Sequence, residues 1–231
     1  MGLRYLCTHG FCSSAREFDQ LRPLLPYESI AITLPGHGTE PGHLSYVQWQ
    51  DWTRHTTTSV NAIHDDVILI GSSMGSLVSA YVAAQGDERV VGLVMVAPYV
   101  FSNDRRSQFT NAIRPFRYLP NVKNRRIRNF TEHPETNYSE FPVHAYLEFD
   151  TLISRAKQKM KHIAVPTLVI SSRQDPTAAE PASTSFVVKN IPQVTGISLD
   201  VPYHGLLRPP LEHRNTLEII ANGIEKFTSS L

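Results

Sequence analysis

Short, nearly continuous apolar runs alternate along the chain with longer stretches of mixed polarity. Continuous rather than alternating apolarity favours strands that are covered on both faces, as in a parallel sheet. The strands predicted in this way cover residues 3–8, 29–34, 66–71, 90–97, 167–171 and 194–199.

The stretches between the apolar runs carry their hydrophobic residues at helical spacing. They predict helices over residues 45–63, 74–85, 181–190 and 213–227. Strands that alternate with helices imply parallel strands joined by helical crossovers. We therefore predict an α/β fold with a mostly parallel sheet of about six strands flanked by helices.

One segment, residues 99–149, breaks this alternation after the fourth predicted strand. Four prolines punctuate it, namely Pro115, Pro120, Pro134 and Pro142. The segment is too long for an ordinary connection between a strand and a helix. We expect it to form a small helical cap, while residues 1–98 and 150–231 form the core.

The strongest chemical motif is Gly71-Ser72-Ser73-Met74-Gly75, between a predicted strand and a predicted helix. It matches the Gly-x-Ser-x-Gly nucleophile elbow, which requires that strand–turn–helix setting. Ser73 has glycines two positions before and after it, and Ser72 has not, so Ser73 is the expected nucleophile. The alternative is a Gly/Ser turn that merely caps a helix.

His9-Gly10-Phe11 follows directly after the first predicted strand. A tetrahedral intermediate needs two hydrogen-bond donors for its negatively charged oxygen. We expect these to be the backbone N–H groups of Phe11 and Met74, with the Phe11 side chain lining the acyl pocket. An ordinary exit from a strand into a loop is the alternative for this tripeptide.

Asp175 and His204 complete the predicted set of catalytic residues. Asp175 ends a strand that runs into a turn at Pro176, and His204 lies on a loop after the last predicted strand. His204 would accept the serine proton, and Asp175 would orient the imidazole. Asp175 could instead be only a turn residue, and Asp200 and His213 are the rival acid and base.

Together these residues resemble the α/β-hydrolase superfamily, and most of all its small carboxylesterases and monoacylglycerol lipases. The motifs that carry the resemblance span nearly the whole chain: His9-Gly10-Phe11, Pro35-Gly36-His37-Gly38, the Ser73 elbow, Asp175 and Tyr203-His204-Gly205. The two antiparallel strands that open larger members are expected to be absent. The resemblance implies an α/β-hydrolase fold with a mobile cap over an acyl pocket.

A serine at the elbow implies acyl chemistry, since relatives that act on halides or epoxides carry aspartate there. We predict a serine hydrolase that cleaves carboxylic esters through an acyl-enzyme, with no cofactor and no metal. A thioesterase or serine peptidase with the same triad is an alternative. A non-catalytic ligand receptor is another, because a fold does not determine function.

Composition narrows the partners and the compartment. The chain has 231 residues, 19% of them charged, and a net charge of +1, which gives no overall attraction to nucleic acid. It has no basic region followed by a long apolar stretch, and no apolar run near the ~18 residues of a membrane span. We expect a cytoplasmic monomer or homodimer with reduced Cys7 and Cys12, a small-molecule acyl ester as substrate, and no stable membrane insertion.

The predicted cap is basic and carries aromatic residues. Its cations are Arg105, Arg106, Arg114, Arg117, Lys123, Arg125, Arg126 and Arg128. They could steer anionic substrates or contact an acidic membrane surface, or they could form only a solvated surface. Phe109 and Phe116 are predicted to line the substrate pocket with Phe11, Cys12 and Tyr203, although the cap aromatics could equally hold the cap on the core.

Overall fold

A computed structural model of the protein describes residues 2–103, 122–123 and 138–231. Its centre is a six-stranded sheet in which every pair of neighbouring strands is parallel. The strands are β1 (Leu3–Thr8), β2 (Ser29–Ile32), β3 (Asp66–Ser72), β4 (Val90–Val96), β7 (Thr167–Ser172) and β8 (Val194–Leu199). Their order is β2-β1-β3-β4-β7-β8, which confirms the predicted parallel sheet of six strands.

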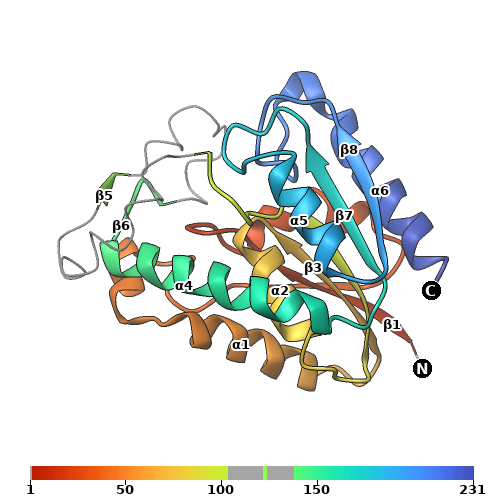
Figure 1. Ribbon diagram of the computed structural model, residues 1–231, viewed down its shortest axis with the longest axis horizontal. Helices are drawn as coiled ribbons and strands as arrows, with labels where there is room; N and C mark the ends of the chain where they lie inside the picture. Colours follow the sequence, from red (N-terminus) through yellow and green to blue (C-terminus); the bar gives the residue numbers. More distant parts are fainter. Residues whose placement is uncertain (1, 104–121, 124–137) are drawn as a thin grey trace.

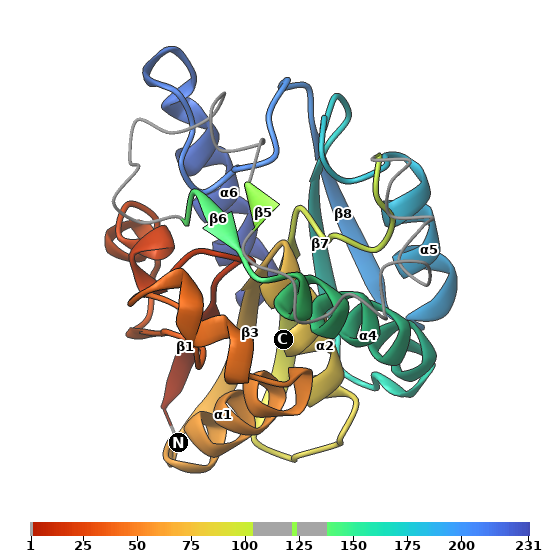
Figure 2. The same cartoon turned by 90° about the vertical axis from the view of Figure 1, so that its left-hand side faces the viewer.

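Helices cover both faces of the sheet (Figures 1 and 2). Four pack on one face: α1 (Trp49–Asn61), α2 (Met74–Ala83), α4 (Val143–Lys159) and α5 (Ala182–Asn190). The amphipathic α6 (Asn215–Thr228) packs on the other face together with the short helix η1 (Ala15–Phe18). The central strand β3 serves both layers, because Leu69 packs with the first group and Ile70 with the second.

Several short elements complete the described part. They are the 3-10 helices η2 (Arg22–Leu24), η3 (Pro41–Tyr46), η8 (Met160–His162) and η9 (Leu211–His213), and an antiparallel pair of β5 (Val122–Lys123) with β6 (Glu140–Phe141). The helix predicted over 45–63 begins only at Trp49, because Gln48 and Asp51 form a capping box there.

Helix α4 was not expected from the sequence. It crosses the position 149/150 where the predicted cap ends and the second part of the core begins. Phe149, Leu152 and Ala156 are buried in the same cluster as residues of α1 and α2, so α4 is part of the packed core. The division into core and cap remains a prediction, since most of residues 99–149 lies outside the described ranges.

The carboxyl ends of all six strands meet at one edge of the sheet, as parallel pairing requires. The predicted site residues follow these ends: the oxyanion loop after β1, the elbow after β3, Asp175 after β7 and His204 after β8. Ligands of open α/β sheets bind at this edge. Among the described residues, no helix combines the length and apolarity that crossing a bilayer requires.

Candidate active site

Ser73 occupies a sharp turn between β3 and α2 and has a left-handed backbone, with φ of 52°. Neighbouring backbone leaves no space for side chains on either flank. A Cβ on Gly71 would lie 2.3 Å from the Gly75 carbonyl oxygen, and a Cβ on Gly75 would lie 2.0 Å from the Thr8 carbonyl oxygen. The glycines of the motif are thus required by close packing, and the strained turn raises Ser73 above the sheet edge.

Hydrogen bonds to the neighbouring strand hold this turn in place. The Ser73 N–H donates to the Val96 carbonyl oxygen at the end of β4, at 2.9 Å. The Ser76 hydroxyl donates to the Gly71 carbonyl oxygen at 2.8 Å and lies 3.1 Å from the Val96 carbonyl oxygen. The elbow is therefore anchored on both sides, which keeps the Ser73 hydroxyl in one position.

Ser73, His204 and Asp175 form a continuous hydrogen-bonded array. The Ser73 Oγ lies 2.7 Å from His204 Nε2, and His204 Nδ1 lies 2.6 Å from Asp175 Oδ2. A neutral imidazole satisfies both contacts when Nδ1–H donates to the carboxylate and Nε2 accepts from the serine. The sequence predicted these three residues together, and the fold brings them into contact from three different strand ends.

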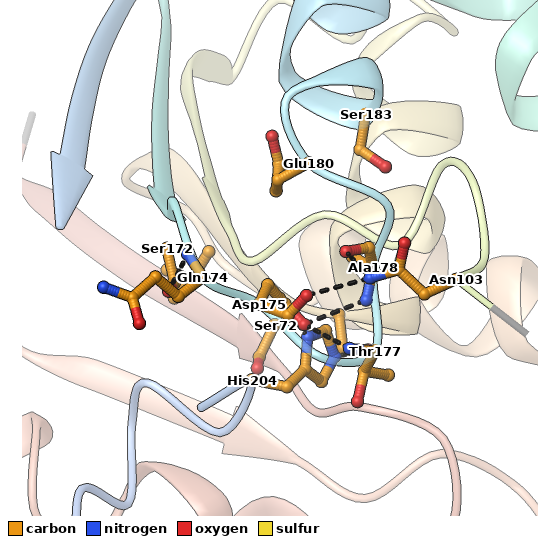
Figure 3. A network of polar contacts seen from close by, with 12 residues as sticks. Ser72, Asn103, Ser172, Gln174, Asp175, Thr177, Ala178, Glu180, Ser183 and His204 are labelled. Atoms are coloured by element: carbon orange, nitrogen blue, oxygen red, sulfur yellow. Dashed lines mark hydrogen bonds and ion pairs between the residues drawn. The ribbon is translucent and has the colours of Figure 1, made fainter. Parts of the chain in front are cut away.

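The second oxygen of Asp175 is also occupied (Figure 3). Asp175 Oδ1 accepts the N–H groups of Thr177 at 2.7 Å and Ala178 at 2.9 Å. Asn103 braces this turn from the segment after β4, because its amide donates to the carbonyl oxygens of Asp175 at 2.9 Å and Ala178 at 3.0 Å. Asn103 was not predicted, since an asparagine in a loop carries no signal of such a contact.

The rival residues have other partners. Asp200 is exposed, and its Oδ1 accepts a hydrogen bond from the Gln174 side chain at 2.8 Å. The His213 ring lies 5.4 Å from the Tyr203 ring, at the short helix η9. Among the described residues, it is His204 that reaches the Ser73 hydroxyl.

The loop after β1 packs directly against Ser73. A Cβ on Gly10 would lie 3.3 Å from the Ser73 Cβ. His9 fixes the loop, because its Nδ1 donates to the Gly10 carbonyl oxygen at 2.7 Å while its Nε2 accepts the Leu34 N–H at 3.0 Å. Burial lowers the pKa of His9, which favours the neutral ring that this pattern requires.

Aromatic side chains gather beside the array. Phe11 stacks on Phe149 of α4, with ring centroids 5.1 Å apart, and meets Phe141 edge-on at 5.2 Å. Tyr99 lies 5.2 Å from Phe149 and 6.3 Å from the His204 ring. Phe11 thus belongs to an apolar wall next to His204. The contribution of α4 to that wall could not be found by pattern, since the helix itself was not predicted.

Tyr138 joins two loops of this edge. Its backbone N–H donates to the Cys12 carbonyl oxygen at 2.9 Å. Its hydroxyl donates to the Gly36 carbonyl oxygen at 3.0 Å and accepts the Thr39 N–H at 2.9 Å. The loops after β1 and β2 are therefore held together by the residue that precedes β6, which no sequence motif indicated.

The remaining predicted pocket residues have varied positions. Cys12 is buried at 1% exposure in the core cluster, and burial raises its thiol pKa well above the ordinary value. Tyr203 is buried, with its hydroxyl 2.8 Å from the Thr216 hydroxyl of α6. Phe109 and Phe116 lie outside the described residues, as do the predicted basic residues of the cap apart from Lys123 in β5. Substrate binding by these residues remains a prediction.

A serine on a strained strand-to-helix turn, joined through histidine to a carboxylate at the edge of a parallel sheet, is the arrangement of the α/β-hydrolase fold. The chain belongs to the alpha/beta hydrolase family, whose family model matches residues 5–218.

Curated relatives match parts of the chain. It is 23% identical over 192 residues to a monoglyceride lipase of Rattus norvegicus, a match that covers 73% of this chain and 63% of the lipase. It is 31% identical over 93 residues to a pimeloyl-[acyl-carrier protein] methyl ester esterase of Neisseria meningitidis, a match that covers 39% of this chain and 35% of the esterase. The chain thus spans less than two thirds of either relative.

The fold extends over almost the whole of a solved structure from a study of LipS and LipT, two metagenome-derived lipolytic enzymes. That structure superposes with a TM-score of 0.81 at 20% identity, and the match covers 96% of this chain and 94% of that one. This likeness establishes the shared architecture of the two chains.

Proposed function

We propose that this chain is a serine hydrolase that cleaves carboxylic esters. The observation that carries the proposal is the hydrogen-bonded array from Ser73 Oγ through His204 to Asp175, with contacts of 2.7 and 2.6 Å. These are the distances at which a proton can pass between a hydroxyl and a general base. The names of the relatives, a monoglyceride lipase and a methyl ester esterase, agree with an ester as substrate.

In the first half-reaction, Ser73 Oγ attacks the ester carbonyl carbon while its proton passes to His204 Nε2. The negative charge on the carbonyl oxygen is stabilised by the N–H groups of Phe11 and Met74. Collapse of the tetrahedral intermediate breaks the bond to the alcohol oxygen, which takes the proton from His204. The acyl group remains on Ser73 as an ester.

The second half-reaction reverses these roles with water. His204 accepts a proton from the water, whose oxygen attacks the acyl carbon, and then returns a proton to Ser73 Oγ as the carboxylic acid leaves. Asp175 holds His204 in the required tautomer throughout and stabilises its positive charge without accepting a proton. Phe11, Tyr99 and Phe149 offer an apolar surface for the acyl chain beside His204.

Covalent labelling tests the nucleophile directly. A fluorophosphonate probe, followed by peptide mapping, is expected to modify Ser73, because an activated serine oxygen attacks the phosphorus, displaces fluoride and forms a phosphonate ester. Ser73→Ala should abolish labelling and hydrolysis of nitrophenyl esters while retaining the folded state by circular dichroism. In the matched variant Ser72→Ala, the label should still map to Ser73. A label found on Ser72 instead of Ser73 would overturn the assignment.

A substrate series tests the ester specificity. Nitrophenyl esters of increasing acyl length, the matching thioesters and the matching anilides should be compared by kcat/KM. Faster turnover of the oxygen esters supports the proposal. Preference for thioesters or anilides would reassign the reaction, and tight binding without turnover would indicate a ligand receptor.

A further inference from the structure

The Glu17 side chain connects the two loops that carry the proposed oxyanion donors. Its Oε2 accepts the backbone N–H of Gly10 at 2.9 Å, and its Oε1 accepts the hydroxyl of Ser72 at 2.5 Å. Gly10 directly precedes Phe11, and Ser72 directly precedes Ser73. The Glu17 carboxylate therefore bonds to the residue directly before Phe11 on one side of the proposed site and to the residue directly before Ser73 on the other.

This bridge lies just beyond the point where sheet pairing ends. Strands β1 and β3 are neighbours, and their last register pair is Thr8 with Gly71. Past that pair the ladder no longer fixes the separation of the two chains. Glu17 joins them just past this pair, at Gly10, two residues after Thr8, and at Ser72, one residue after Gly71. It therefore connects the two chains where the strand pairing has ended, at the edge where the reaction is proposed.

The carboxylate is itself held in place. Glu17 lies in η1, where its N–H donates to the Ser14 carbonyl oxygen at 3.0 Å. The next residue, Phe18, is fully buried and anchors this short helix on the sheet. Both groups that the carboxylate accepts are also shielded from water, since Gly10 is buried and Ser72 is 4% exposed. Hydrogen bonds to an ionised acceptor in such surroundings are strong.

A carboxylate suits these partners. The backbone N–H of Gly10 and the hydroxyl of Ser72 both donate to Glu17, which has two acceptor oxygens. A glutamine could keep both contacts, because its oxygen can accept the Gly10 N–H while its NH₂ group donates to the Ser72 hydroxyl oxygen. Glu17→Ala removes both acceptor oxygens and so breaks the bridge.

We propose that Glu17, acting through Gly10 and Ser72, is a positioning residue for ester hydrolysis. It sets the separation between the Phe11 and Met74 N–H groups, and it does not touch the substrate. This inference rests on the proposed function, because the separation matters only if an oxyanion forms between those two groups.

The test compares kcat, KM and inhibition by a trifluoromethyl ketone, whose adduct with Ser73 carries an oxyanion. Glu17→Ala is expected to lower kcat by about tenfold to a hundredfold with KM nearly unchanged, since misplacing a donor costs less than deleting one. The ketone should lose affinity by a similar factor. A role in stability alone would leave the ratio of its inhibition constant to KM unchanged, and that result would overturn the proposal.

Ser72→Ala supplies a second route, because it removes the other end of the same bridge. It should also lower kcat, and its effect should be smaller in the Glu17→Ala background than alone, since both changes break one connection. Should Glu17→Ala fail to fold, Ser72→Ala by itself decides the matter. Full kcat and unchanged ketone affinity in Ser72→Ala would contradict the inference.

The control is Glu218→Ala, the same substitution at an exposed position on α6. It should leave kcat, KM and ketone affinity unchanged. Fluorophosphonate labelling separates the two proposals: if Ser73 is labelled but Glu17→Ala keeps full turnover, only the positioning role is wrong. If Ser73 of the unsubstituted chain is not labelled, both proposals are overturned.

Discussion

At the scale of single residues, Asp175 has both carboxylate oxygens engaged. One accepts from His204, and the other accepts two backbone N–H groups. An asparagine there must direct its NH₂ group either at the backbone donors or at His204, and in the second case it favours the wrong imidazole tautomer. We expect Asp175→Asn to lower kcat by about 10⁴-fold, as in another serine hydrolase where the orienting carboxylate was replaced.

Steady-state hydrolysis of a nitrophenyl ester measures this effect. Asp200→Asn is the matched control, because Asp200 is exposed and bonds to Gln174 instead of His204. It should leave kcat within about twofold, as surface substitutions usually do. A mild effect of Asp175→Asn would show that another group orients His204.

His37 should make the fold sensitive to acid. Burial, with a smaller contribution from His9, holds its pKa well below the ordinary value of 6.5. The unfolded chain therefore binds more protons than the folded one once the pH falls below about 6.5, and stability decreases from there downward. The free energy of unfolding should fall by up to about 1.4 kcal/mol per pH unit for each such histidine.

Denaturant unfolding between pH 7.5 and about pH 5 tests this, a window set by the ordinary histidine pKa. His37→Phe removes the titrating group but keeps an aromatic ring, so its stability should decline less steeply with acid. His64→Phe, the same change at an exposed position, should retain the slope of the unsubstituted chain. Equal slopes for His37→Phe and the unsubstituted chain would refute the assignment.

At the scale of elements, the connection from β3 to α2 depends on how closely α2 approaches β1. Gly75 touches the end of β1, where a Cβ would lie 2.0 Å from the Thr8 carbonyl oxygen. Since that atom is backbone, the helix itself would have to move. We expect Gly75→Ala to lower the free energy of unfolding by at least about 4 kcal/mol, or to prevent folding.

Gly42→Ala is the control for this substitution, because no atom lies within 4 Å of a Cβ added there. It should leave the denaturation midpoint nearly unchanged. If Gly75→Ala were as stable as Gly42→Ala, the packing of α2 against β1 described above would be incorrect.

At the scale of the whole molecule, Tyr138 ties the segment before β6 to two loops at the carboxyl edge of the sheet. Its hydroxyl bonds to the Gly36 carbonyl oxygen and the Thr39 N–H, both distant in sequence. Tyr138→Phe leaves these backbone groups without that partner. Because Thr39 is exposed and Gly36 is half-buried, water can take the place of the hydroxyl. We expect a loss of about 0.5–1.5 kcal/mol in the free energy of unfolding, the usual net contribution of a hydrogen bond.

Chemical denaturation checks this expectation, with Tyr46→Phe as the matched control. Tyr46 is 86% exposed, so losing its hydroxyl should have almost no effect. Equal stability of the two variants would mean that the loops after β1 and β2 are held together without the Tyr138 hydroxyl.

Local pattern determined the strands and the elbow. β1 and β8 have the predicted bounds, and the other four strands are close to theirs. The inner strands β1, β3, β4 and β7 could be found because a strand covered on both faces must be apolar throughout. The Gly-x-Ser-x-Gly motif could be recognised because close backbone contacts require both of its glycines: Gly71 approaches Gly75 within the turn, and Gly75 approaches Thr8 of β1. Ser73, Asp175 and His204 could be selected because each follows a strand whose carboxyl end must lie at the same edge.

Tertiary structure alone decided which polar groups meet. Glu17, Asn103 and Tyr138 bond to partners far away in sequence, and such contacts leave no periodic signal. Helix α4 was missed because its first residues lie in the proline-containing segment that was assigned to the cap, and its place against α1 and α2 became evident only in the packed core. Hydrophobic periodicity indicates which face of a single helix or strand is buried. Hydrogen-bond partners across the molecule depend instead on how the elements pack together.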